Sequence, residues 1–417
     1  MRGDTQPVGQ RLAFSLLRVA TTVDTLGMSV AVVALPMAAV TVLGADAGQV
    51  SVLAAAVWLP ALLFGLPAGA AADRLAPRTL MRVADGALAL LLSAVAFAAW
   101  LGSLTLPLLV GTAFVAGGLA VVAAAAYRTV LPAVVPFERL PMATARLQGS
   151  EWTARVIGAA VAGVVTQVAG AAGGLLICAA AAMIAVTAVS LMRPAYGTAR
   201  PATGAKERPG GPAAGLRLLI ADPLLRAVTV FGAGSALGRA MVQAVQVAYL
   251  LLQVQLSTAA TGLLLSVAGV GGILGALLSP RLGRRLGTAR ALVLVQLAGV
   301  PLMALMPLAG SAASTPLFAV GALAGGFTLV AGNVTVAGFR LTYCPPEMLG
   351  RVSAGMMTLT YGAMPLGALM AAAVSALGDA RAALGAGVAV QFLAAAGLAA
   401  GPLRGRRDFP VRQPAAV

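Results

Sequence analysis

The stretch RPAYGTARPATGAKERPGGPAAG, residues 193–215, interrupts a chain that is otherwise almost continuously apolar. Its many Pro, Gly and charged residues are typical of a flexible linker. Six long apolar runs precede it and six follow it. The sequence therefore predicts two halves, residues 1–192 and 216–403, joined by this linker and followed by a polar tail at 404–417.

Each apolar run has roughly the 20 residues that a helix needs to cross the hydrocarbon core of a bilayer. The runs are continuous and lack the strict alternation of apolar and polar residues that a membrane β-barrel requires. We therefore predict an all-α membrane protein with twelve transmembrane helices in two pseudo-symmetric six-helix bundles. The predicted spans are 13–43, 49–72, 79–102, 107–131, 146–171, 173–192, 225–253, 259–279, 290–310, 316–342, 352–377 and 383–403.

The composition excludes several classes of protein. Of the 417 residues 60% are hydrophobic and 10% charged, whereas an average soluble domain has about 25% charged residues. The net charge of +16 comes from Arg in short clusters between apolar runs, not from a basic face with aromatic residues that would bind nucleic acid. There is no His, Cys178 lies in an apolar run and Cys344 in a loop, so neither a metal nor a cofactor is expected.

The sequence also does not indicate an enzyme. Lys206, the single lysine, has no Gly-rich phosphate loop before it, so the chain contains no ATP-driven pump. The lack of His and of an acidic metal cluster disfavours a membrane-embedded enzyme.

The positive charges predict the orientation, because cytoplasmic loops carry an excess of Lys and Arg. Nearly all loop arginines lie in the N-terminus, the loops after the second, fourth and eighth spans, the linker and the tail, whereas the opposite loops hold a single Arg381. Both termini and the linker are therefore expected in the cytoplasm. The preference for Ala, Gly and Arg over Lys is typical of a GC-rich bacterial genome, which suggests a bacterial inner membrane.

The two halves resemble each other. The run Gly65–Gly69 recurs as Gly271–Gly275, and Ala116–Gly118 recurs as Ala324–Gly326, at nearly the same offset and on corresponding spans. Parallel repeats of this kind place a transport site near the middle of the bilayer, between the halves.

The strongest family signal is GLPAGAAADRLAPR, residues 65–78, after the second predicted span. It resembles the loop signature of the major facilitator superfamily, in which a Gly precedes Asp-Arg and a further basic residue. LPAVVPFERLPMA, residues 131–143, and PEMLGRVS, residues 346–353, resemble the branch that contains macrolide-efflux pumps and the enterobactin exporter. The resemblance covers nearly the whole chain and implies a transporter of small molecules.

Some positions depart from the family pattern. Ala76 and Pro77 stand where the loop signature has Gly and a basic residue, and Thr144 stands where the branch often has Asn. The fifth span contains Gly158–Gly163 without the Gly-Pro pair of many drug antiporters. The resemblance therefore implies the superfamily more directly than it implies drug–proton antiport.

The residues of the loop signature predict a conformational latch. Gly65 and Gly69 allow helix backbones to approach closely. Asp73 can interact with the positive N-terminus of a neighbouring helix and pair with Arg74 and Arg78. Such a cluster would hold the two halves together in one conformation and release them in the other. The alternative for the arginines alone is that they only set the topology.

Few strongly polar residues fall inside the predicted spans, where they are costly and usually functional. Asp24 lies in the first span, Arg239, Gln243 and Gln246 in the seventh, and Asn333 in the tenth. Gln243 is one helical turn from Arg239 and shares its face. We predict that these five residues line a central cavity for substrate and protons. For Asp24, a structural pairing with Arg239 is the alternative.

Three further charges lie near the ends of predicted spans. Glu151 and Arg155 have the spacing of neighbours on a helix and are expected to form a local pair. Asp85 is expected to join the charges at the cytoplasmic end of the third span.

These features favour a secondary active transporter that exports a drug or secondary metabolite, coupled to protons or sodium. A nutrient or metabolite importer of the same superfamily is the alternative. A membrane scaffold or receptor would instead have an uncharged, tightly filled centre. The expected partners are a small-molecule substrate, the coupling ion and the lipid bilayer, with the protein acting as a monomer.

A topology reporter tests the predicted orientation. Alkaline phosphatase, which is active only outside the cytoplasm, should be inactive when fused after Val417, because the arginine-rich tail is expected to stay inside. The same reporter inserted after Gly310, in a loop without Lys or Arg, should be active. Activity of the C-terminal fusion would contradict the predicted orientation.

Overall fold

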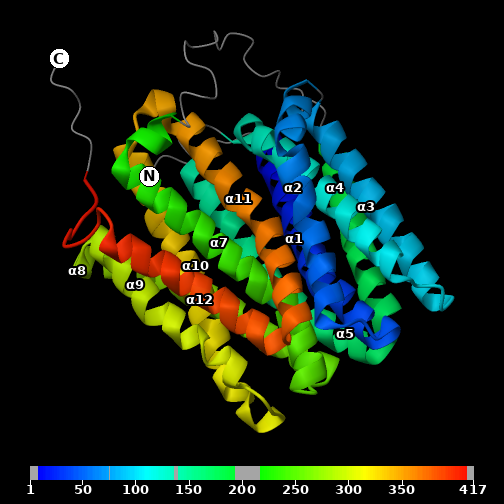
Figure 1. The fold of residues 1–417 in the computed structure, drawn as a ribbon. Coiled ribbons are helices and arrows are strands. Elements are labelled where there is room, and N and C mark those ends of the chain that lie inside the picture. Colours follow the sequence, from blue (N-terminus) through cyan, green and yellow to red (C-terminus); the bar gives the residue numbers. More distant parts are fainter. Residues whose placement is uncertain (1–7, 75, 136–139, 193–216, 411–417) are drawn as a thin grey trace. The chain divides into compact units, whose positions relative to one another are not determined.

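The computed structural model describes residues 8–74, 76–135, 140–192 and 217–410, and the other residues are grey in Figure 1. Within these ranges the description leaves out the side chains at 8–11, 65–74, 128–129, 132–133, 140–142, 145 and 346–347.

Helices make up nearly all of the described chain, and none of its residues forms a strand. The N-terminal half contains α1 (Val8–Leu43), α2 (Ala47–Arg74), α3 (Pro77–Trp100), α4 (Leu106–Val134) and α5 (Leu140–Leu191). The C-terminal half contains α7 (Pro223–Ala248), the π-helical turn η3 (Tyr249–Gln253), α8 (Thr258–Leu286), α9 (Thr288–Met303), the 3-10 turns η4 (Met306–Leu308) and η5 (Ala312–Ser314), α10 (Thr315–Tyr343), α11 (Pro346–Leu377) and α12 (Ala380–Ala400).

Eleven helices of the described ranges are long and apolar enough to cross a membrane, and one of them holds two spans. α5 has 52 residues, and at the helical rise it would be about 78 Å long, more than twice the thickness of a hydrocarbon core. At Gly170 its backbone takes a φ of 67° and leaves the helical conformation. Ala143 and Val189, near its two ends, belong to one buried cluster, so the chain reverses at Gly170. The predicted all-α membrane fold is confirmed, with the fifth and sixth predicted spans meeting within α5.

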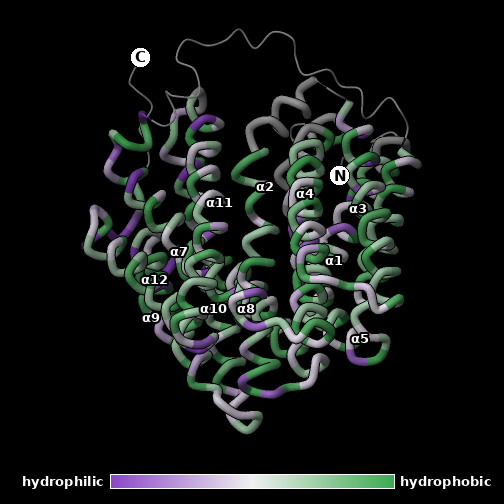
Figure 2. The backbone as a smooth tube through the Cα atoms, turned by 45° about the vertical axis from the view of Figure 1, so that its right-hand side comes forward, coloured by the Kyte–Doolittle hydropathy of each residue, from purple (hydrophilic) through white to green (hydrophobic). Residues whose placement is uncertain are grey.

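Apolar residues, drawn green in Figure 2, recur along the whole length of the helices. Large apolar side chains such as Leu90, Val168 and Leu377 are mostly exposed. Exposed apolar side chains in such number would be unfavourable in water but match lipid acyl chains.

By their packing the residues form two compact units. Among the described residues, the first unit contains those within 8–45, 56–192 and 257–266, and the second contains those within 46–55, 217–256 and 267–410. The units therefore follow the two halves of the sequence, except that one short segment of each half groups with the other unit.

In the first unit, α5 packs along α1 and α3, and α3 also packs on α4. The beginnings of α1 and α3, the end of α4 and both ends of α5 meet in one buried cluster, which we call the first end cluster. It includes Leu17, Met81, Val130, Ala143 and Val189. Beginnings of some helices therefore lie beside ends of others. This is the arrangement expected when successive helices cross a membrane in alternating directions.

In the second unit, α7 packs between α11 and α12, and α9 packs on α10 and α12 (Figure 1). The beginnings of α7, α9 and α11 and the ends of α10 and α12 meet in a second end cluster. It includes Leu224, Phe231, Leu292, Phe339, Met356, Leu398 and Phe409.

A close contact between two helices of the first unit recurs in the second. In the first unit Gly118 of α4 faces Pro60 of α2, and in the second Gly326 of α10 faces the carbonyl oxygen of Ala268 in α8. Both members of the second pair stand 208 residues after those of the first. The contact at Gly326 is so close that a Cβ atom there would overlap the Ala268 carbonyl.

A second contact also recurs. A Cβ atom at Gly158 of α5 would lie 2.7 Å from the Cβ of Ser29 in α1, and one at Gly367 of α11 would overlap the carbonyl of Leu237 in α7. Small residues at such crossings allow the close packing that holds helices together in lipid. The internal repeat of the sequence is therefore also a repeat of helix contacts.

The crossing at Gly326 can be tested with a matched pair of variants in α10. Gly326→Ala should destabilise the protein by about 1–3 kcal/mol, because the added methyl group meets backbone and α8 must move. Gly338→Ala is the control, since no atom lies within 4 Å of a Cβ at Gly338. The measurement is the melting temperature of each purified variant in detergent. Equal melting temperatures would show that the α8–α10 crossing is not as close as described.

Candidate functional site

Three carboxyl groups from three helices come together in the first unit: Asp24 of α1, Asp85 of α3 and Glu151 of α5. Asp24 interacts electrostatically with Glu151, and Asp85 interacts with Asp24. The packing of α5 along both α1 and α3 brings these residues together although they are far apart in sequence. We call them the acidic cluster.

Direct contacts fix α1 against α5 on both sides of Asp24. On one side Thr22 Oγ1 donates a hydrogen bond of 2.8 Å to Ser150 Oγ. On the other side Gly158 allows α5 to approach Ser29 closely. Because Ser150 directly precedes Glu151, the bond from Thr22 also holds the backbone that carries Glu151 against α1.

The hydroxyl groups of Thr25 and Ser29, which follow Asp24 on α1, donate hydrogen bonds to backbone carbonyls of the same helix. Thr25 Oγ1 donates to the carbonyl of Thr21, and Ser29 Oγ donates to the carbonyl of Thr25, both at 2.7 Å. Neither hydroxyl proton is therefore available to the carboxyl group of Asp24.

Two polar groups at the acidic cluster are shielded from water. Asp85 is only 3% exposed. The hydroxyl group of Tyr127 in α4 is buried, has no hydrogen-bond partner among the described atoms and interacts electrostatically with Glu151. A buried hydroxyl group close to a carboxyl group can donate a hydrogen bond to it or accept one from it when the carboxyl group is protonated.

Among the described side chains, Arg155 is a cation close to the cluster. Arg155, one turn beyond Glu151, interacts with it electrostatically, but no ion pair joins them in the described structure. Instead the guanidinium of Arg155 is exposed and lies 4.8 Å from the centre of the Trp152 ring. The expected local pair is thus only an electrostatic interaction, and Asp85, expected among the charges of the helix end, is buried beside Asp24.

The cluster does not have the make-up of a metal site. No group of three or more His, Cys, Asp or Glu side chains within the described ranges could hold a metal ion. Tyr127 could not be predicted from sequence, because a single Tyr in an apolar run is equally common at a membrane interface. Tyr127 becomes a candidate site residue only because α4 brings it close to Glu151 of α5.

The polar residues predicted in the seventh and tenth spans belong to the second unit. Arg239 of α7 is half-buried and interacts electrostatically with Tyr361 of α11. Gln243 and Asn333 are exposed, and Gln246 is half-buried. Because Asp24 belongs to the other unit, its pairing with Arg239 and the common cavity stay predictions.

The predicted latch lies mostly outside the described side chains. Gly65, Gly69, Asp73 and Arg74 form the last turns of α2, and their side chains are not part of the description. The latch therefore stays a prediction as well.

Arg78, the remaining latch residue, has a contact of its own. Its Nε donates a 3.0 Å hydrogen bond to the carbonyl of Val189, and a terminal nitrogen donates to the carbonyl of Ser190. These are among the last carbonyls of α5, which lack partners within their own helix. Arg78 therefore joins the beginning of α3 to the end of α5.

Comparison with known proteins identifies one family. A family model described as Major Facilitator Superfamily matches residues 19–368, a range that includes the acidic cluster and Arg239. No curated protein matches the chain by sequence.

Solved structures of transporters have the same fold. The nucleoside transporter NupG is 12% identical, with 93% of this chain and 98% of that chain covered and a TM-score of 0.71. A bacterial homologue of the iron transporter ferroportin is 16% identical, with 96% and 100% covered and a TM-score of 0.73. A bacterial homologue of the human lysosomal transporter Spinster is 16% identical, with 94% and 97% covered and a TM-score of 0.69. At these sequence identities the similarity shows a common fold. It does not show the substrate of this protein or the direction of transport.

Proposed function

Because the chain belongs to the Major Facilitator Superfamily, we propose that it is a secondary active transporter that exports a small organic molecule, driven by protons that bind at the acidic cluster. That the protein is a membrane transporter follows from its family. The direction, the kind of substrate and the coupling ion are the proposal.

The acidic cluster is the observation that carries the proposal. Asp24 interacts electrostatically with both Glu151 and Asp85, and Asp85 is almost completely shielded from water. Their mutual repulsion is strong where water cannot screen it. Binding or loss of a proton changes this repulsion and thereby the relative free energies of two arrangements of α1, α3 and α5. Coupling needs such a difference between two states.

A proton fits this cluster better than a sodium ion does. A metal ion needs several oxygen ligands at once, and the described residues offer no group of acidic side chains placed to share one. A proton needs a single carboxyl oxygen. The buried hydroxyl of Tyr127 adds a group that can hydrogen-bond to either form of a neighbouring carboxyl group.

In the second unit, Arg239 is proposed to contact the substrate. A guanidinium inside a membrane span recognises anionic or hydrogen-bond-accepting groups strongly. Gln243 and Gln246 on the same helix and Asn333 on α10 offer both donors and acceptors. Proton binding and substrate binding would then be handled by different units.

Export is supported by the resemblance of residues 131–143 and 346–353 to the branch of macrolide-efflux pumps and the enterobactin exporter. The loop signature at Gly65–Arg78 is proposed to act as the latch of one conformation. The charge distribution supports a bacterial inner membrane with both termini in the cytoplasm. We also propose that the protein works as a monomer.

Deletion of the gene tests the direction and finds the substrate together. Cells without the transporter should accumulate its substrate, detected by untargeted mass spectrometry of cell extracts and medium against the parent strain. Failure to grow on a nutrient, with no compound accumulating, would show import and overturn the proposed direction.

Proton coupling by the acidic cluster is tested with the substrate that the deletion strain accumulates. In inverted membrane vesicles with an imposed pH gradient, Asp24→Asn, Asp85→Asn and Glu151→Gln should each lower gradient-driven uptake by about 5- to 150-fold, the range of a typical coupling free energy. Downhill exchange without a gradient should change much less. Asp379→Asn is the control, because Asp379 only caps α12 through Ala382 and Asn caps a helix equally well. Normal gradient-driven uptake in all three cluster variants would refute a coupling role.

A further inference from the structure

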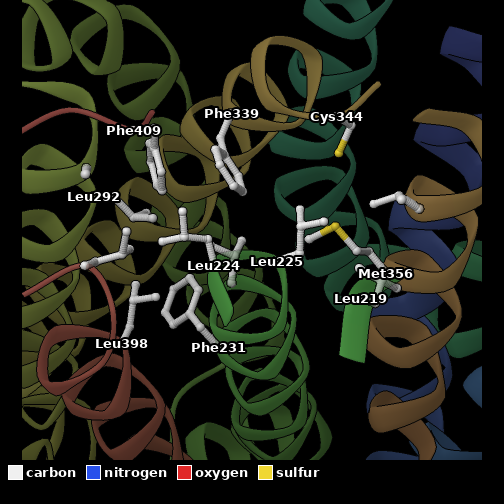
Figure 3. Packing of buried hydrophobic residues seen from close by; sticks show 14 of the residues in the cluster. Leu219, Leu224, Leu225, Phe231, Leu292, Phe339, Cys344, Met356, Leu398 and Phe409 are labelled. Carbon is white, nitrogen blue, oxygen red and sulfur yellow. The ribbon is translucent and has the colours of Figure 1, made fainter. Parts of the chain in front are cut away.

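A groove of about 300 Å³ runs along the second unit, between the first turns of α7 and the last turns of α12. Its walls are almost entirely apolar, and they are formed by Pro223, Ala227 and Val230 on one side and by Leu393, Gly397 and Pro402 on the other. Phe231 and Leu398, which lie close together in the second end cluster (Figure 3), line it as well.

The groove is hollow because of Gly397. No atom lies within 4 Å of the position that a Cβ would take there. Val230 and Leu393 beside it are 65% and 68% exposed, so the groove opens away from the protein. Both helices belong to candidate membrane spans. Inside a membrane, an outward-facing apolar groove contacts lipid acyl chains rather than water.

One end of the groove carries a positive charge. Arg226, one turn into α7, lines the groove and is exposed. Among described residues its guanidinium makes one hydrogen bond, to the carbonyl of Ile220. The nearest acid along the chain, Asp222, is occupied elsewhere, since it accepts bonds from the backbone N–H of Leu224 and the hydroxyl of Tyr343. Most donors of Arg226 therefore remain for a ligand.

The chain after α12 is held in place next to this end of the groove. Asp408 accepts a 2.8 Å hydrogen bond from the backbone N–H of Thr288, at the beginning of α9, and the N–H of Phe409 donates to the Thr288 hydroxyl. The Phe409 ring stacks on Phe339 with 4.4 Å between centroids (Figure 3). Residues 403–409 are therefore part of the folded unit.

This held segment adds further positive charge. Arg404, two residues beyond Pro402 of the groove wall, is exposed, as is Arg406. The acid of the segment, Asp408, is used to cap α9. The polar end of the groove thus carries the guanidinium of Arg226, with Arg404 two residues beyond its wall, and the described acids nearest in sequence, Asp222 and Asp408, are used in other hydrogen bonds.

We propose that this groove binds an anionic phospholipid, with an acyl chain along Val230, Leu393 and Gly397 and the headgroup phosphate at Arg226 and Arg404. Guanidinium groups bind phosphate through paired, charge-assisted hydrogen bonds. Clusters of Arg at the ends of spans attract anionic lipids. A groove that is apolar along its length and cationic at one end matches the shape and charge of such a lipid. The site is separate from the acidic cluster and does not depend on what the protein transports.

Native mass spectrometry of the full chain in detergent tests this site, with phosphatidylglycerol and phosphatidylcholine added in equal amounts. Phosphatidylglycerol should be retained preferentially. Arg226→Gln and Arg404→Gln should each lower this preference by about fivefold, the contribution of one basic residue near a lipid surface. Arg381→Gln, at the opposite end of α12, should leave it unchanged. Equal binding of the two lipids, or a preference that survives in the double variant, would overturn the proposal.

The acyl-chain groove is tested separately. Gly397→Phe should fill the groove and abolish retention of phosphatidylglycerol, and the smaller Gly397→Leu should weaken it. Gly385→Phe is the matched control on α12, because a Cβ there also meets no atom within 4 Å and Gly385 does not line the groove. Melting temperatures confirm that each variant is folded. Full lipid binding in both Gly397 variants, or displacement of the lipid by glycerol phosphate, which has no acyl chain, would show that phosphate alone is bound and would overturn the proposal.

Discussion

The absence of water from the interior of a membrane determines how this protein is built. Backbone groups must be paired within helices, and helices gain little from hiding apolar surface that lipid already accepts. Close van der Waals contact then has to hold them together. The crossings at Gly158, Gly326 and Gly367 provide it, since in each case the neighbouring helix occupies the space of the missing side chain. The recurrence of these contacts in both units explains why the sequence repeats its small residues.

The same absence of water makes each buried polar group significant. Some of these groups are paired: Gln296 donates to the carbonyl of Thr328, and the hydroxyl of Tyr249 donates to that of Ala309. At the acidic cluster, Asp85 is 3% exposed, and the hydroxyl of Tyr127 is buried without a hydrogen-bond partner among the described residues. Ionisable groups that lie close together inside a membrane span are costly and usually functional.

Sequence alone predicts the spans closely, because crossing a membrane depends on local composition, and even the reversal at Gly170 falls within two residues of the predicted break between the fifth and sixth spans. The site could be predicted only in part. Scarcity of charge singles out Asp24 and Arg239, but the approach of Asp85 to Asp24 depends on which faces of separate helices meet. Gly397 is one of 50 glycines, and nothing in the sequence distinguishes it. Pairwise contacts between distant helices, which hydropathy does not encode, account for the difference.

The central claim is that the acidic cluster exchanges protons within the membrane-spanning part of the protein. Infrared difference spectroscopy of the purified protein in lipid, titrated from acidic to alkaline buffer, measures this without a known substrate, because a protonated carboxyl group has its own C=O stretching band. The account predicts a band that disappears as the buffer becomes alkaline, and that is reduced or shifted by Asp24→Asn, Asp85→Asn and Glu151→Gln but not by Asp379→Asn. The same titrating band in the wild type and in all three cluster variants would contradict the account.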